Sequence, residues 1–166
     1  MSLQYIPESE KAMDLIRELK AIVNALDEKE IDYALCGALA MAVYGRPRAT
    51  LDIDIIAPRK SLDAIGGQLE GLGFIPNQET MFFAGGDVEI HRFCKPFPRD
   101  GEMLVLDLLV STRATMKAFR ERLTVEWNKS RLSVVSPKGM ILLKSLRNSG
   151  QDKDDIAYLK EIDDED

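Results

Sequence analysis

Hydrophobic residues recur every three or four positions between Ser9 and Leu26, and this spacing predicts an amphipathic helix over residues 9–26. Further along, short apolar runs typical of buried strands alternate with short helical segments that end at glycine or proline. The predicted strands are 32–36, 50–57, 81–84, 88–93, 103–110 and 132–135, and the remaining predicted helices are 38–44, 61–72, 115–122, one that begins at Ser136-Pro137, and 152–162. The pattern therefore predicts a single α/β (α+β) domain over residues 1–166, with a mixed sheet of about five or six strands flanked by helices.

Turn and cap signals mark several of these boundaries. Ser61 and Ser136 are each expected to cap the helix that follows them. Gly85-Gly86-Asp87 supplies the positive φ that a tight turn requires, which predicts a hairpin between the third and fourth predicted strands. The acidic segment 161–166 is expected to be a solvated tail.

Two aspartates interrupt the apolar strand predicted at 50–57, although aspartate is uncommon in strands. Because side chains alternate along a strand, Asp52 and Asp54 share one face. Asp107 likewise stands alone in the apolar run 103–110, and it can face the first two if the strands are neighbours, about 4.8 Å apart. Carboxylates this close raise each other's pKa unless cations compensate them, and Mg²⁺ is the natural complement. The sequence therefore predicts a divalent-metal site.

Basic side chains accompany this candidate metal site. Arg46 and Arg48 precede the aspartate strand, so their guanidinium groups can reach a phosphate or an acceptor; the alternative is that both are solvated loop residues. Lys144 lies in an apolar helix with Arg147 three positions later on the same face. A lysine on a buried face is unusual unless it is paired, and the alternative is a lysine on the helix surface.

Four other side chains are secondary candidates. Asp152 and Asp155 are expected to buttress the cations or to cap the last helix. His91, the lone histidine, can act as an acid–base group, although an exposed strand histidine is the commoner case. Trp127 can stack on a base, although a single tryptophan beside a strand is more often part of the core or its rim.

The segment GALAMAVYGRPRATLDIDI (residues 37–55) and the tripeptide Leu106-Asp107-Leu108 resemble the DNA polymerase β-type nucleotidyltransferase superfamily. The pattern of that superfamily is Gly-Gly or Gly-Ser after a hydrophobic residue, a spacer, two acidic residues separated by a hydrophobic one, and later a third acidic residue between hydrophobic ones. The first segment and SPKGMILLKSLRNSGQDKDDIAYL (residues 136–159) are similar to the bacterial AbiEii-like group, which includes toxin–antitoxin members. The resemblance covers about residues 31–161 and implies the nucleotidyltransferase fold.

The resemblance also implies roles for individual residues. Asp52 and Asp54 would hold the metal ion that escorts a nucleoside triphosphate (NTP). Asp107 would complete the catalytic metal site and help to take the proton from the acceptor hydroxyl. Two Mg²⁺ ions, with Mn²⁺ as the alternative, are the implied cofactors. The implied nucleotide- and phosphate-binding residues are Gly37, Ala38, Arg46, Arg48, Lys144 and Arg147.

Ala38 departs from the pattern, which has Gly or Ser at this position. Backbone N–H groups at a helix N-terminus can still bind phosphate, but the serine hydroxyl is missing. Alanine also lacks the freedom of glycine at positive φ. The departure bears on phosphate affinity more than on the fold.

The expected activity is the transfer of a nucleoside monophosphate (NMP) from an NTP to an acceptor hydroxyl on a tRNA, a protein or a small molecule, with release of pyrophosphate. Two alternatives stay open. One is a regulatory, antitoxin-like protein that binds nucleotide and acts through a toxin or antitoxin partner without turnover. The other is an antibiotic-type nucleotidyltransferase, which we expect to require a homodimer because the sequence offers no second acceptor-binding domain.

Composition and charge narrow the class of protein. The chain has 166 residues, of which 45% are hydrophobic and 30% charged, as in ordinary globular proteins. Its net charge of −6 lies in residues 151–166, and removing their eight acidic and two basic side chains leaves 20 of each. A neutral body argues against a broad nucleic-acid-binding face.

The cysteines and the apolar runs exclude further classes. Cys36 and Cys94 lack metal-ligand spacing, so we expect no zinc site and two reduced thiols in a cytoplasmic protein. No apolar run approaches the roughly 20 residues that cross a bilayer, and the N-terminus shows no secretory signal. No membrane association is therefore expected.

Overall fold

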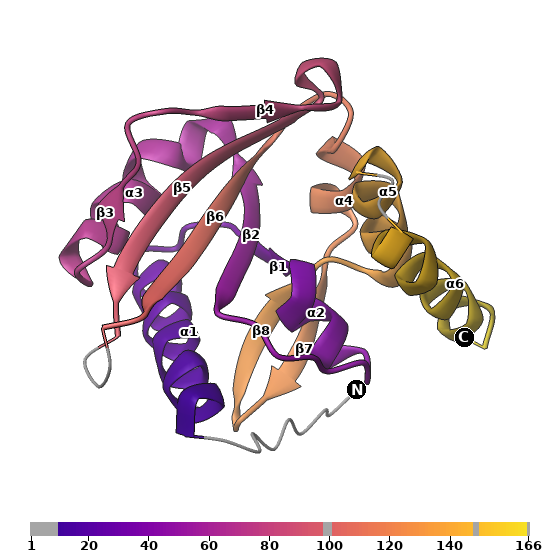
Figure 1. Cartoon of the computed structure of the whole chain (residues 1–166), viewed down its shortest axis with the longest axis horizontal. Helices are drawn as coiled ribbons and strands as arrows, with labels where there is room; N and C mark the ends of the chain where they lie inside the picture. Colours follow the sequence, from indigo (N-terminus) through magenta and orange to yellow (C-terminus); the bar gives the residue numbers. More distant parts are fainter. Residues whose placement is uncertain (1–9, 98–100, 148–149, 166) are drawn as a thin grey trace.

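The central feature of the structure is an eight-stranded mixed sheet (Figure 1). The computed structural model describes residues 10–97, 101–147 and 150–165. The helices are α1 (Glu10–Glu28), α2 (Gly37–Val43), α3 (Leu62–Gly71), α4 (Met116–Arg120), α5 (Pro137–Arg147) and α6 (Gly150–Asp164), with short 3-10 turns η1 (Arg59–Ser61) and η2 (Ala84–Gly86). The strands are β1 (Ala34–Cys36), β2 (Asp52–Pro58), β3 (Ile75–Pro76), β4 (Met81–Phe83), β5 (Val88–Pro96), β6 (Met103–Ser111), β7 (Leu123–Trp127) and β8 (Ser130–Val134).

The strand order is β3-β5-β6-β2-β1-β8-β7, and β4 pairs with β5. β2 runs parallel to β6, and β1 runs parallel to β8. The other pairs are antiparallel. The predicted mixed α/β architecture is therefore confirmed, with eight strands instead of about five or six.

The two strands that the pattern does not predict are β3 and β7. β3 has only two residues, both exposed, so it shows no alternation. β7 joins β8 through Asn128 and Lys129, which both adopt positive φ. Because this two-residue turn lacks glycine, the hairpin carries no strong sequence signal. Trp127 at the end of β7 is 5% exposed and belongs to the core.

The two faces of the sheet have different neighbours (Figure 1). α1 and α3 cover one face, where Lys95 of β5 donates a hydrogen bond to Glu18 of α1 at 3.0 Å. The predicted amphipathic helix is confirmed in α1, whose buried residues include Leu15, Leu19, Ile22, Val23 and Leu26. α5 lies on the other side, next to α4 and α6, and this second face holds the candidate site.

Several predicted boundaries are confirmed and two need correction. β4 and β5 form the predicted hairpin, and the backbone N–H of Gly139 donates to Oγ of Ser136, which confirms that cap. Ser61 makes no capping hydrogen bond because it belongs to the 3-10 turn that precedes α3. α6 continues to Asp164, so residues 161–164 are helical instead of forming a tail. Ser9 and residue 166 of the predicted elements lie outside the described residues.

No helix in the described part of the chain combines the length and the apolar composition of a membrane-spanning segment.

Candidate active site

A cavity of about 390 Å³ opens on the sheet face opposite α1 and α3. Strands β2, β4, β5 and β6 form its floor and one wall, and α2, α5 and the loop before β2 complete it. Eight of the nine predicted site residues line it, and Arg46 does not. The eight are Gly37, Ala38, Arg48, Asp52, Asp54, Asp107, Lys144 and Arg147.

Strand register brings the three predicted carboxylates together. Asp54 on β2 lies directly opposite Asp107 on the parallel strand β6, and Asp52 is two residues before Asp54 on the same face. Asp52 is exposed, Asp54 is half-buried, and Asp107 is 7% exposed. The cluster therefore extends from the rim of the cavity into its floor.

The backbone at position 37 lies so close to Asp54 that only glycine fits at this position. Gly37 has a φ of +67°, a conformation that other residues rarely adopt. A Cβ at this position would lie 2.1 Å from Oδ2 of Asp54. The glycine that begins α2 thus lets the backbone approach the carboxylate directly.

Ala38 does not carry the strain expected from its departure from the family pattern. Positive φ in this turn falls on Gly37, and Ala38 is not among the non-glycine residues with positive φ. Ala38 lines the cavity as the second residue of α2. Alanine at this position therefore removes a hydroxyl without distorting the turn.

The environment of the cluster disfavours the ionised form of two aspartates. Burial, followed by the charges of Asp107 and Asp52, raises the pKa of Asp54 to about 7. Burial and Asp107 also raise the pKa of Asp52. Lys144 and Arg147 act on Asp54 in the opposite direction without cancelling this effect. Within the described residues, no hydrogen bond or ion pair reaches the carboxylate of Asp54.

The oxygen donors suit a hard divalent cation. Within the described part of the chain, the carboxylates of Asp52 and Asp54 accept no hydrogen bond and form no ion pair, and carboxylate oxygens are the donor type that Mg²⁺ prefers. Among the residues that the structure describes, no three Asp, Glu, His or Cys side chains form a ready metal-ligand group. The third carboxylate, Asp107, is occupied by a neighbouring side chain.

That neighbour is Arg92, a site residue that the sequence interpretation missed. Nε of Arg92 donates to Oδ1 of Asp107 at 2.8 Å, and Nη2 donates to Oδ2 at 2.9 Å. Arg92 on β5 lies directly opposite Asp107 on β6, so the antiparallel register imposes the contact. Alternation along β5 places Arg92 opposite His91, which is a weak signal for its face, but the pairing partner depends on the register of two strands.

Acidic residues on α6 hold the basic side chains of the cavity. Lys144 is 5% exposed, and its Nζ lies 2.9 Å from Oδ2 of Asp155. Arg48 donates to the same oxygen at 2.8 Å. Asp152 lies 3.6 Å from Lys144 and 3.8 Å from Arg147. The predicted buttressing role of Asp152 and Asp155 is confirmed, and Lys144 is buried instead of lying on the helix surface.

Arg46 lies outside the cavity. Its Nε is 3.3 Å from Oδ1 of Asp155, and its guanidinium group lies 5.4 Å from the centre of the Tyr158 ring. Among the described residues no side chain forms a hydrogen bond with Oδ1 of Asp155, so Arg46 contributes an ion pair without a hydrogen bond. Arg46 therefore contacts α6 without lining the cavity.

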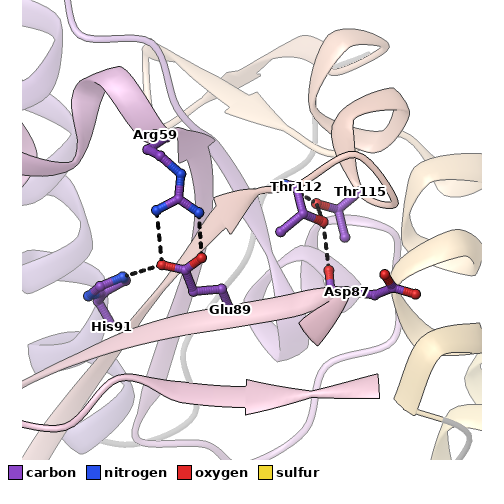
Figure 2. A network of polar contacts seen from close by, with 6 residues as sticks. All are labelled: Arg59, Asp87, Glu89, His91, Thr112 and Thr115. Carbon is purple, nitrogen blue, oxygen red and sulfur yellow. Dashed lines mark hydrogen bonds and ion pairs between the residues drawn. The ribbon is translucent and has the colours of Figure 1, made fainter. Parts of the chain in front are cut away.

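His91 lies on the opposite sheet face, in a second polar network (Figure 2). Glu89 accepts two hydrogen bonds from Arg59 and lies 2.9 Å from Nε2 of His91. The hydrogen bonds from Arg59 lower the pKa of Glu89 against the effect of burial. Thr112 donates to the backbone oxygen of Asp87 in the same region. His91 therefore does not reach the carboxylate cluster.

Solved structures with the same fold support this description. No family model matches the chain, and no curated protein matches its sequence. The lincosamide antibiotic adenylyltransferase LnuA, solved with lincomycin bound, is 18% identical, and the match covers 87% of this chain and 95% of that one with a TM-score of 0.57. The chain has the nucleotidyltransferase fold.

Two further matches agree with that fold. The Thermotoga maritima protein TM1012, for which nucleotidyltransferase activity has been proposed, is 15% identical over 90% of this chain and 92% of its own, with a TM-score of 0.59. The antibiotic-resistance factor ANT(2'')-Ia is 15% identical over 87% and 81%, with a TM-score of 0.56. The nucleotidyltransferase fold implied by the sequence motifs is confirmed, while similarity to the AbiEii-like group stays a prediction.

Proposed function

We propose that the protein is a divalent-cation-dependent nucleotidyltransferase that transfers an NMP group from an NTP to an acceptor hydroxyl. The observation that carries the proposal is the meeting of Asp52, Asp54 and Asp107 in one cavity, beneath a wall of basic side chains. Mg²⁺ bound by the carboxylates would supply positive charge to the triphosphate and its transition state, with Mn²⁺ as the expected substitute.

The proposed reaction forms one bond and breaks another. The acceptor oxygen attacks the α-phosphorus, the bond from phosphorus to the oxygen that bridges the β-phosphate breaks, and pyrophosphate leaves with the electron pair. The proton of the hydroxyl passes to Asp107, because each of its oxygens keeps a lone pair beyond the one that Arg92 occupies. The remaining contribution of the protein is positioning and charge.

The basic wall is the proposed triphosphate site. Lys144 and Arg147 on α5, with Arg48 before β2, direct positive charge into the cavity that contains Asp52 and Asp54. Asp155 fixes two of these cations, so less side-chain entropy is lost when a phosphate binds. Arg46 has no direct role in this proposal, because it does not line the cavity.

The opposite wall is the proposed acceptor side. Met81, Phe83, Val88, Ile90 and Leu109 form an apolar surface beside Asp107. Such a surface suits a small molecule with an apolar portion. The apolar surface therefore favours an antibiotic-type small molecule as a second candidate acceptor, in addition to a tRNA or a protein. LnuA was solved with lincomycin, and ANT(2'')-Ia with adenylyl-2''-tobramycin.

Label transfer tests the proposal. The protein is incubated with Mg²⁺ and each α-³²P-labelled NTP, together with a cell extract or with lincomycin or tobramycin, and the labelled product is identified. Asp52→Asn is expected to abolish transfer and Mg²⁺-dependent nucleotide binding, whereas Asp87→Asn, an acid outside the cavity, leaves both unchanged. Nucleotide binding that Asp52→Asn does not weaken contradicts the metal site. Binding without any labelled product supports the regulatory alternative.

A further inference from the structure

Arg92 differs from the other basic residues of the cavity in the carboxylate that it contacts. Arg48 and Lys144 pair with Asp155, and Arg147 pairs with Asp152, so these three are tied to α6. Arg92 alone among the cavity cations pairs with a motif carboxylate, Asp107. It therefore belongs to the acidic cluster and not to the basic wall.

The contact is built into the fold. Both oxygens of Asp107 accept from one guanidinium group, the geometry in which arginine binds a carboxylate most strongly. The side chain of Asp107 is only 10% exposed, and that of Arg92 is 37% exposed. The residues are register partners on neighbouring strands, so their contact does not depend on a loop. A guanidinium group also keeps its charge at all ordinary pH values.

The contact with Arg92 reduces the net negative charge of the carboxylate cluster. The cluster of Asp52, Asp54 and Asp107 carries three negative charges when it is fully ionised, and Arg92 compensates one of them. Two remain, which one divalent ion neutralises. A second divalent ion at Asp107 would lie beside the guanidinium group, and charges of like sign repel at such distances.

We infer that Arg92 is the resident cation of Asp107, so that the chain binds one divalent ion, at Asp52 and Asp54, instead of the two expected from the family resemblance. The inference rests on the proposed function and refines it. Arg92 is a positioning residue that holds Asp107 toward the acceptor. Its guanidinium group also places fixed positive charge next to the transferred phosphoryl group, a role that arginine fills in other phosphate-transfer sites.

Counting bound Mn²⁺ tests the inference without measuring turnover. The full chain is saturated with a non-hydrolysable NTP analogue and titrated with Mn²⁺, and free Mn²⁺ is followed by electron paramagnetic resonance. We expect one protein-dependent ion per wild-type chain after correction for ions bound by the analogue alone. Arg92→Gln frees Asp107 and is expected to bind two, and two ions about 3.5–4 Å apart give a magnetically coupled spectrum. Arg92→Lys retains the charge and is expected to bind one.

Arg59→Gln is the matched control, because Arg59 likewise donates two hydrogen bonds to one carboxylate, that of Glu89 on the opposite sheet face. It is expected to keep one ion. Two bound ions on the wild-type chain would overturn the inference. A single bound ion on a folded Arg92→Gln variant would overturn it as well. Neither result contradicts the proposed function. If neither the analogue nor Mn²⁺ binds to the wild-type chain, the proposed function itself fails. The wild-type count stands even if Arg92→Gln does not fold.

Discussion

Asp54 and Asp155 are aspartates of the same molecule in opposite electrostatic situations. Asp155 on α6 is 0% exposed, yet it has Arg48 and Lys144 within 2.9 Å. Although burial acts to raise the pKa of Asp155, hydrogen bonds from these cations lower it below its ordinary value. Asp54 on β2 has no cation in direct contact within the described residues, and burial, followed by the charges of Asp107 and Asp52, raises its pKa to about 7.

The difference separates a structural acid from a candidate ligand. Asp155 has protein partners that complete its charge, so it stabilises the fold and orients the basic wall. Asp54 lacks such partners among the described residues, and under the proposed function a divalent cation from outside the chain would favour its ionised form. Strongly raised pKa values inside a cavity are typical of functional sites. Removing each charge in turn should therefore change stability in opposite directions.

The largest loss of stability is expected for Asp155→Asn. Removing this charge leaves the buried Lys144 and the half-buried Arg48 without their main counter-ion, and breaking a buried pair typically costs about 3–5 kcal/mol in the free energy of unfolding. Urea denaturation at pH 7 measures the loss. Asp154→Asn, an exposed neighbour on the same helix, is the control and should stay within about 0.5 kcal/mol of wild type. Equal stability of the two variants would show that the basic wall does not need Asp155.

Asp54→Asn is expected to raise the free energy of unfolding of the metal-free protein at high pH. Between about pH 4 and the raised pKa of about 7, folded Asp54 keeps a proton that the unfolded chain has lost. The free energy of unfolding of the wild type should therefore fall as pH rises through this window, by up to about 4 kcal/mol. Asp54→Asn should show a flatter pH dependence and a higher melting temperature at pH 8.

Mg²⁺ should offset the loss of stability that ionised Asp54 causes at high pH. The ion should raise the melting temperature of the wild type at pH 8, because it binds the ionised carboxylates of the folded state. It should leave Asp54→Asn nearly unchanged, while Asp87→Asn should respond as the wild type does. If metal-free wild type is as stable at pH 8 as at pH 5, Asp54 is not an uncompensated acid.

Local patterns predicted most of the fold. The spacing of apolar residues in α1 and the isolated aspartates of β2 and β6 are properties of single segments, and the structure contains each of them. The pattern does not predict β7 because its turn places Asn128 and Lys129 at positive φ without the glycine that usually signals such a turn. The end of α6 was missed because charge near a terminus resembles a solvated tail.

The sequence predicted those residues of the candidate site that belong to short local motifs. Gly37, Asp52 and Asp54 form one short motif, and Asp107 repeats its strand pattern. The partner of Asp107 was not predictable, since Arg92 reaches it through the register of β5 on β6. The exclusion of Arg46 from the cavity likewise depends on where α6 packs, because Asp155 and Tyr158 draw its side chain away. Both the Arg92–Asp107 contact and the position of Arg46 depend on contacts between segments that are distant in the sequence.

A moderate effect is expected for Gly37→Ala, which tests how closely the backbone must approach Asp54. The added methyl would overlap the carboxylate and occupy a strained backbone conformation, at a cost of about 1–3 kcal/mol. It should also weaken Mg²⁺ binding, because Asp54 must move. Gly67→Ala in α3 is the matched control, since nothing lies within 4 Å of its added Cβ. If both variants bind Mg²⁺ equally well, the close approach of Gly37 has no role in the site.

The smallest effect is expected for Arg46→Gln, because Asp155 keeps both of its closer partners. The side chain of Arg46 is 41% exposed, and pairs of this kind contribute less than about 1 kcal/mol. Nucleotide affinity should also stay within about twofold of wild type, since Arg46 does not line the cavity. Arg48→Gln should weaken nucleotide binding at least about tenfold, because its guanidinium group both lines the cavity and contacts Asp155. Isothermal titration with a non-hydrolysable NTP analogue compares them, and a loss of affinity in Arg46→Gln as large as that in Arg48→Gln would place Arg46 in the phosphate site after all.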